Sequence, residues 1–135
     1  MHSGSLPPVA VAIGFVDRIN RGDVDALGKL MTDDHELLVF DEPPVAGREA
    51  NVDAWRGYLQ SFPDYVIYPR RIAESDRNVA ILGHTTGSHL GLPDAEESSL
   101  TVIWLAEVVG GAVRRWRLVE DEPENRRRFG LEGQP

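Results

Sequence analysis

The chain contains no cysteine, which excludes disulfide bonds, thiolate metal sites and thiol catalysis. It has no apolar run of the roughly 18 residues that a membrane-spanning helix needs. Its first residues combine neither a basic start nor a long apolar stretch, so we expect no secretory signal. Positive charge is scarce, because 14 lysines and arginines are set against 22 acidic residues, for a net charge of −8. This balance disfavours nucleic acids and membranes as partners, and a cytoplasmic location follows by default.

The remaining composition is that of an ordinary soluble globular protein, with 41% hydrophobic and 27% charged residues. A chain of 135 residues is long enough for one domain with a single core. No repeat, low-complexity tract or linker divides it. We therefore predict one domain over residues 7–131, with flexible termini at 1–6 and 132–135.

The first half of the chain carries helical patterns. Apolar residues after Pro8 recur at the i, i+3, i+4 and i+7 positions of one helix face, at Ala12, Phe15, Val16 and Ile19. Gly22 suits the left-handed closing position of this helix, and Asp23 is a good N-cap for a short second one. Asp33-Asp34 is expected to break that second helix before a buried strand at 37–40. After a turn at 41–44, apolar residues at helical spacing predict a third helix from Gly47 to Phe62.

The second half changes to a period near two, which predicts strands at 65–73, 79–89, 99–109 and 112–119. Residues 76–78 and 110–111 suit tight hairpin turns. Pro123 and the residues after it indicate a short C-terminal helix. The order predicts an α+β fold, with three N-terminal helices laid against a curved antiparallel sheet.

Three motifs in series carry a family resemblance. They are Phe62-Pro63-Asp64, Gly87-Ser88-His89-Leu90-Gly91 and Val113-Arg114-Arg115-Trp116. In this order and spacing they resemble the SnoaL-like, polyketide cyclase-like branch of the NTF2-like superfamily, over roughly residues 8–131. The resemblance implies a cone-shaped, cystatin-like fold around an apolar pocket. It also implies a homodimer formed through the outer face of the sheet.

The resemblance weakens where the related enzymes keep their catalytic groups. The tyrosine of the ketosteroid isomerases aligns with Phe15, which has no hydroxyl group, and their strand acid falls near Ile103. The histidine and aspartate of the polyketide cyclases align with Trp104 and Arg117, which cannot serve as acid and base. Limonene-epoxide hydrolases use two aspartates bridged by an arginine, of which Asp41 and Arg117 could supply parts. The signature thus predicts the scaffold and argues against the best-known reactions on it.

Two catalytic candidates remain, Asp41 and His84. Asp41 follows an apolar strand, where burial beside aromatic rings would raise its pKa toward neutrality. The alternative is a plain turn carboxylate. His84 could be a pocket base or a structural strand histidine. His89 fits strand-end architecture, and His35, beside the acidic pair, is expected to be solvated.

The predicted ligand-binding residues are mostly aromatic, because such side chains give a pocket apolar area with a few polar handles. They are Phe15, Trp55, Tyr58, Trp104, Trp116 and Arg117. Core packing is the alternative for each tryptophan. The expected ligand is a small hydrophobic metabolite bearing a carbonyl or epoxide, with no metal and no cofactor. Three functions stay open: cofactor-free acid/base catalysis of isomerase, cyclase or hydrolase type, non-catalytic binding, and a dimeric interaction module.

Overall fold

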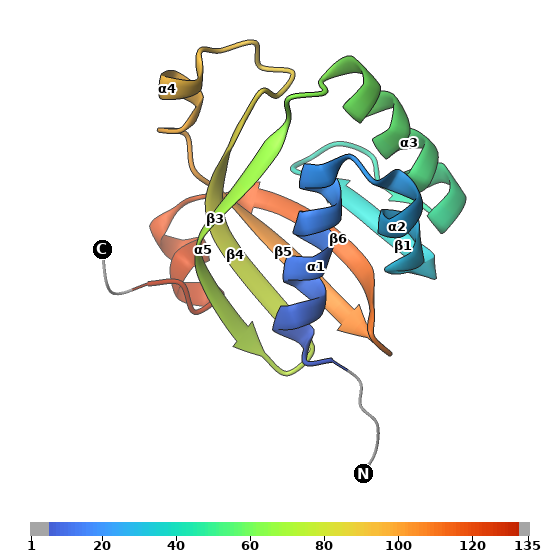
Figure 1. Ribbon diagram of the computed structural model, residues 1–135. Coiled ribbons are helices and arrows are strands. Elements are labelled where there is room, and N and C mark those ends of the chain that lie inside the picture. Colours follow the sequence, from blue (N-terminus) through green and yellow to red (C-terminus); the bar gives the residue numbers. More distant parts are fainter. Residues whose placement is uncertain (1–5, 133–135) are drawn as a thin grey trace.

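The computed structural model describes residues 6–132, so the predicted flexible termini lie almost entirely outside the described residues (Figure 1). Five helices and six strands follow one another within this range. They are α1 (Pro8–Arg21), α2 (Val24–Lys29), β1 (Met31–Val39), β2 (Val45–Ala46), α3 (Arg48–Ser61), β3 (Val66–Ser75), β4 (Asn78–Thr86), α4 (Asp94–Glu97), β5 (Val102–Val109), β6 (Ala112–Glu120) and α5 (Pro123–Arg128).

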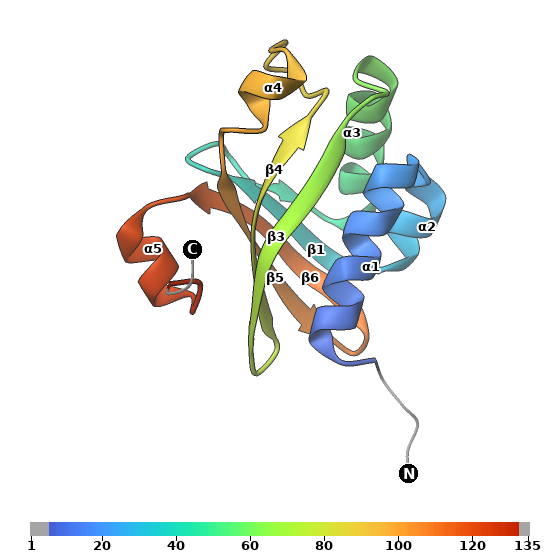
Figure 2. The same ribbon diagram turned by 60° about the vertical axis from the view of Figure 1, so that its left-hand side comes forward.

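The strands form one curved sheet in the order β2-β1-β6-β5-β4-β3. Helices α1, α2 and α3 lie on its concave side, whereas α5 lies against the other side (Figure 2). The α+β prediction is confirmed. The sheet is not wholly antiparallel, however, because β1 pairs with β6 in parallel. Alternation of side chains fixes the two faces of a strand but not the direction of its neighbour, so the sequence pattern could not reveal this pairing.

The first helix begins and ends as predicted, whereas the second begins as predicted but already ends at Lys29. Gly22 closes α1 at φ 70°, in the left-handed region that favours glycine. The Asp23 side chain caps α2 by accepting the N–H of Ala26 at 3.1 Å. Asn20 then fixes the end of α1 to β3, because its amide donates to the carbonyl of Ile67 at 2.9 Å and accepts the N–H of the same residue at 2.8 Å.

The break expected at Asp33-Asp34 was wrong, because both residues lie within β1. Their carboxylates are exposed and reach arginines on neighbouring elements: Asp33 pairs with Arg48 at 2.6 Å and Asp34 with Arg114 at 3.4 Å. The sequence also gave no sign of the two-residue β2 or of α4. Because α4 and its flanking turns occupy the β4–β5 connection, β4 ends at Thr86 and β5 begins only at Val102.

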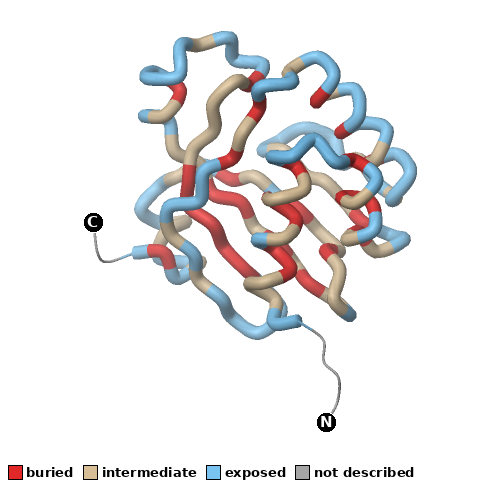
Figure 3. Tube along the Cα trace, viewed as in Figure 1, coloured by how far each residue is buried: buried red, intermediate tan, exposed pale blue. Residues whose placement is uncertain are grey.

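Buried residues gather along the central strands and the helices that face them (Figure 3), and the core has two layers, one on each face of the sheet. The larger layer fills the concave side between the sheet and the helices α1, α2 and α3. The smaller layer packs on the convex side under the C-terminal segment and contains Ala80, Leu82, Ile103, Val119 and Leu131. None of the helices in residues 6–132 has the length and apolarity to cross a bilayer.

Candidate functional site

The aromatic candidates predicted from the sequence meet on the concave side of the sheet. Trp104 and Trp116 project from the adjacent strands β5 and β6, where Trp116 lies opposite Ala106. Phe15 of α1 covers Trp116, with ring centroids 4.7 Å apart. Trp55 of α3 belongs to the same buried cluster. This interior, between the concave face and α1 and α3, is the first part of the candidate site.

Several polar atoms in this interior are fully buried and have no hydrogen-bond partner among residues 6–132. They are the indole nitrogens of Trp55, Trp104 and Trp116, Nε2 of His35 and Oδ1 of Asn51. An indole N–H can only donate a hydrogen bond, and leaving such a donor unsatisfied in a buried site costs about 1–3 kcal/mol. Three unsatisfied donors in one interior are therefore unusual for a site that serves only as a packed core.

His35 was expected to be solvated, and that expectation was wrong. Its side chain is fully buried on β1, with its ring 5.7 Å from that of Phe15. Its Nδ1 lies 2.6 Å from the carbonyl oxygen of Val113, so Nδ1 carries the proton that is donated. Burial lowers the pKa of His35, against the smaller opposite effects of the Val113 carbonyl, Asp34 and Glu36. The neutral ring therefore presents an unshared electron pair on Nε2 toward the interior.

One end of this interior is bordered by α3, the end of β4 and the connection that contains α4, and we call this end the mouth. Glu97 of α4 is only 1% exposed. Its carboxylate accepts hydrogen bonds from the hydroxyl of Thr85 and, at 3.4 Å, from the N–H of Ser88. Thr85 follows Val79 and Ile81 at two-residue spacing on β4, so it lies on the same concave face. The carboxylate is thus held at the edge of the interior.

Tyr58 connects α3 to the same mouth. Its hydroxyl group lies 2.8 Å from Nδ1 of His89 and accepts the backbone N–H of His89 at 3.2 Å. Burial raises the pKa of Tyr58, and the charge of Glu97 adds to that effect. The pKa of the neighbouring Tyr65 is raised for the same two reasons and by the proximity of Tyr58. Both phenols are therefore protonated at neutral pH, and each can act as a hydrogen-bond donor.

The structure explains why two of the sequence motifs occur together. Gly87 of the Gly-Ser-His-Leu-Gly motif lies against Asp64 of the Phe-Pro-Asp motif, and a Cβ atom built at Gly87 would lie 2.4 Å from the carbonyl oxygen of Asp64. Gly87 also has φ 70°. Only glycine fits both demands. The two motifs therefore meet in a close backbone contact beside the mouth.

The two predicted catalytic residues lie away from this interior. Asp41 is exposed on the turn after β1. His84 lies on the convex face, because it alternates with the inward-facing Ile81 and Thr85. Its ring stacks on Tyr68 at 4.7 Å, and its Nδ1 accepts a hydrogen bond from Arg70 at 3.1 Å. Burial, followed by the charge of Arg70, lowers the pKa of His84.

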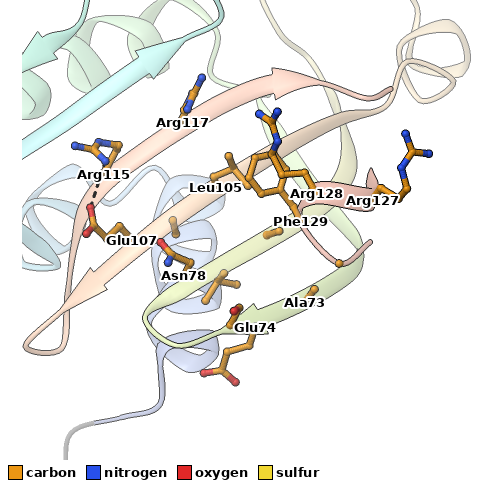
Figure 4. Close-up of a pocket in the computed structure, with 15 residues that line it drawn as sticks. Ala73, Glu74, Asn78, Leu105, Glu107, Arg115, Arg117, Arg127, Arg128 and Phe129 are labelled. Carbon is orange, nitrogen blue, oxygen red and sulfur yellow. Dashed lines mark ion pairs between the residues drawn. The ribbon is translucent and has the colours of Figure 1, made fainter. Parts of the chain in front are cut away.

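Arg117, the remaining predicted ligand-binding residue, also lies on the convex face, where it lines a hollow beside α5 (Figure 4). The sequence therefore predicted the aromatic part of the interior and missed its two buried ionisable groups, His35 and Glu97. A strand read from Met31 onward would have placed His35 on the same face as Met31. No local pattern marks Glu97. No three histidine, aspartate or glutamate side chains within residues 6–132 gather closely enough to hold a metal ion.

A curved sheet wrapped around helices, with an aromatic interior, defines the cone-shaped class that the motifs suggested. Residues 12–116 match the SnoaL-like domain, and the chain belongs to that family. Among curated proteins, none matches this chain by sequence.

Solved structures agree with this fold. An uncharacterized cystatin fold protein from Novosphingobium aromaticivorans superposes with a TM-score of 0.73 at 19% identity, over 85% of this chain and 99% of that one. The epoxide hydrolase/cyclase-like enzyme SalBIII, which has a role in pyran ring formation in the polyether salinomycin, superposes with a TM-score of 0.67 at 15% identity, over 82% of this chain and 88% of that one. An LEH-like epoxide hydrolase of M. tuberculosis superposes with a TM-score of 0.65 at 15% identity, over 82% of this chain and 80% of that one. At these identities the likeness concerns the fold alone.

Proposed function

We propose that the interior of the cone binds a small, neutral, largely apolar molecule that carries hydrogen-bond-accepting oxygen atoms, such as a ketone or an epoxide. The observation that carries this proposal is the set of three buried indole N–H groups without acceptors. A carbonyl or ether oxygen supplies the acceptor that these donors lack, while the aromatic walls take up the carbon skeleton.

The charges in and around the interior support a neutral ligand. Within residues 6–132, the buried polar or charged residues are His35, Asn51, Ser88 and Glu97, and none of them is a lysine or an arginine. An anionic ligand would find no counter-charge there and would meet the carboxylate of Glu97 at the mouth. Burying an unpaired charge costs far more than burying a hydrogen-bonded neutral group. Two proteins of similar fold are named as an epoxide hydrolase/cyclase-like enzyme and an LEH-like epoxide hydrolase, and an epoxide is a neutral oxygen-bearing group.

Binding of a matched pair of probes tests this function. We expect the ketone 2-decalone to bind more tightly than the hydrocarbon decalin, by about three- to tenfold for each indole hydrogen bond it gains. Trp104→Phe and Trp116→Phe remove the indole N–H but keep an aromatic ring, so each should weaken ketone binding and leave hydrocarbon binding nearly unchanged. Calorimetry of the full chain measures both. Equal affinities for the two probes, or no binding of either, would refute the proposal.

A second candidate, cofactor-free acid/base catalysis in the same interior, is favoured by His35. Its neutral ring and the indole of Trp116 pack beside the same residue, Phe15. In such a site Nε2 could take a proton from the carbon next to a bound carbonyl, while an indole N–H stabilises the resulting enolate oxygen.

Deuterium exchange into the α-carbons of 2-decalone, followed by NMR, tests this candidate. His35→Asn keeps a donor near the position of Nδ1 and removes Nε2, so it should abolish any exchange above the buffer rate. Unchanged exchange in this variant would exclude His35 as the base. Exchange at the buffer rate in the unaltered protein would leave binding alone as the function.

A further inference from the structure

A second hollow, of about 670 Å³, lies on the convex face of the sheet beside α5, with the whole sheet between it and the cone interior (Figure 4). We call it the convex groove. Strands β3 to β6 and the end of α5 line it. Part of its lining is apolar and comes from Ala73, Ala80, Leu105 and Phe129. An apolar floor in a surface groove is the first requirement for holding a hydrophobic tail.

The charged part of the lining is mostly positive. It consists of four arginines and two glutamates: Arg115, Arg117, Arg127, Arg128, Glu74 and Glu107. The groove therefore has a local charge of +2, in a chain whose net charge is −8. A cationic surface that persists on a strongly acidic protein concentrates anions at that place.

The ion pairs leave the positive charge concentrated at one end of the groove. Glu107 is already engaged by Arg114 at 3.1 Å and by Arg115 at 3.5 Å. Arg117 and Arg127, in contrast, have no ion-pair partner within residues 6–132. Arg128 has only an exposed partner on its own helix, Glu124, at 3.6 Å. Exposed pairs of this kind contribute little and give way easily to a better ligand.

Two of these arginines line the groove together with the apolar residue Leu105. Arg117 and Arg128 extend toward the same side of the groove, with Leu105 lying between their bases (Figure 4). The guanidinium carbon of Arg128 lies 6.0 Å from the centre of the Phe129 ring, which limits where that side chain can go. Paired guanidinium groups suit the planar oxygens of a carboxylate or a phosphate.

We propose that the convex groove binds a small amphipathic anion, with a carboxylate or phosphate headgroup between Arg117 and Arg128 and an apolar tail along Leu105 and Phe129. The acidic net charge of the chain opposes long polyanions, which would extend beyond the groove. A second copy of the chain is a poor occupant, because a two-fold contact centred on the groove would bring two net-positive surfaces against each other. The homodimer predicted from the family resemblance must therefore be centred elsewhere if it uses this face.

Titration of the ¹⁵N-labelled full chain with three ten-carbon probes tests the site. Decanoate and decyl phosphate, kept below their micelle concentrations, should shift the amide signals of β4, β5 and α5. Decanol has the same tail without the charge and should not shift the amides of α5, which lies on the far side of the sheet from the cone interior. Arg117→Gln/Arg128→Gln should lower the affinity for both anions at least about tenfold, since a hydrogen bond to a charged group contributes this much or more to binding. A preference for either anion supports the site and identifies the headgroup.

The control variant Arg21→Gln/Arg56→Gln removes the same charge from exposed arginines of α1 and α3, on the opposite side of the sheet. It should bind the anions as the unaltered protein does. An equal loss of anion affinity in both double variants would show that only the net charge of the protein matters. A loss of affinity in the control alone would place the anion between α1 and α3. Either result overturns the proposal, as would decanol shifting the α5 amides as decanoate does, or anion shifts confined to α1 and α3. A change in molecular mass on Arg117→Gln/Arg128→Gln without a change in anion affinity would identify a copy of the chain as the occupant instead.

Discussion

Replacing His35 with asparagine should change how the stability of the protein depends on pH. His35 is fully buried, and burial lowers its pKa below the ordinary value of 6.5. In the unfolded chain this histidine takes up a proton near pH 6.5, whereas in the folded protein it does so only at a lower pH. Below pH 6.5 the unfolded state therefore binds more protons, and the free energy of unfolding falls as the pH falls.

The size of this effect follows from the same linkage. One group that is protonated only in the unfolded state lowers the free energy of unfolding by up to about 1.4 kcal/mol per pH unit. Between pH 6.5 and 5 the loss is therefore at most about 2 kcal/mol, and it levels off once the pH falls below the pKa in the folded state. A loss of this size is measurable against the roughly 5–15 kcal/mol of an ordinary domain.

Urea unfolding at several pH values between 7.5 and 5 measures the effect. His35→Asn can still donate to Val113 but cannot take up a proton, so its stability should depend less on pH than that of the unaltered protein. Loss of the ring beside Phe15 should lower its stability at pH 7.5 by about 1–3 kcal/mol, which does not affect the comparison of slopes. His89→Asn, which removes an exposed histidine, is the control. Equal slopes in His35→Asn and the unaltered protein would refute the buried, neutral state of His35.

Two further predictions concern the scaffold. Gly83→Ala should destabilise the protein by about 3 kcal/mol or more, because its Cβ atom would lie 2.3 Å from the carbonyl oxygen of Tyr68. Gly57→Ala, on the open face of α3, should instead stabilise it by about 0.5–1 kcal/mol. Thermal or urea unfolding that ranked the two variants the other way would contradict the packing of β4 on β3. Asn20→Ala should lower the free energy of unfolding by about 1–3 kcal/mol, because it leaves the N–H and the carbonyl group of Ile67 without their partner. A free energy of unfolding within about 0.5 kcal/mol of that of the unaltered protein would show that Asn20 does not hold α1 on β3.

The sequence was most informative where one local rule determined the structure. The stripe that includes Phe15, the cap at Asp23 and the turn at Gly110-Gly111 each rest on the chemistry of a few neighbouring residues, and each element formed as expected. The strand around Asp33-Asp34 was missed because acidic residues usually interrupt apolar patterns. Here arginines distant in the sequence compensate the two charges. Tertiary contacts of this kind are invisible to local patterns.

The candidate site was harder to predict because it depends on which face each strand turns inward. Trp116 and Arg117 are neighbours in the sequence, yet the first lies in the interior and the second lines the convex groove. The predicted catalytic role of His84 depended on its facing inward, and the paired register of β4 turns it outward. Glu97 lies at the mouth only because the β4–β5 connection folds back through α4, and no periodicity in the sequence predicts that helix.

These placements narrow the choice between a binder and an enzyme. With Asp41, His84 and Arg117 outside the interior, the buried ionisable groups that face it within residues 6–132 are His35, Glu97 and the tyrosines of the mouth. Glu97 is committed to Thr85 and Ser88, and the tyrosines hold their protons at neutral pH. A neutral imidazole with a free electron pair is then the one group suited to accept a proton at pH 7 without first giving up a partner. Any acid/base catalysis in this cone would therefore depend on His35, and a protein that binds ketones but exchanges their α-protons no faster than the buffer does is a binding protein.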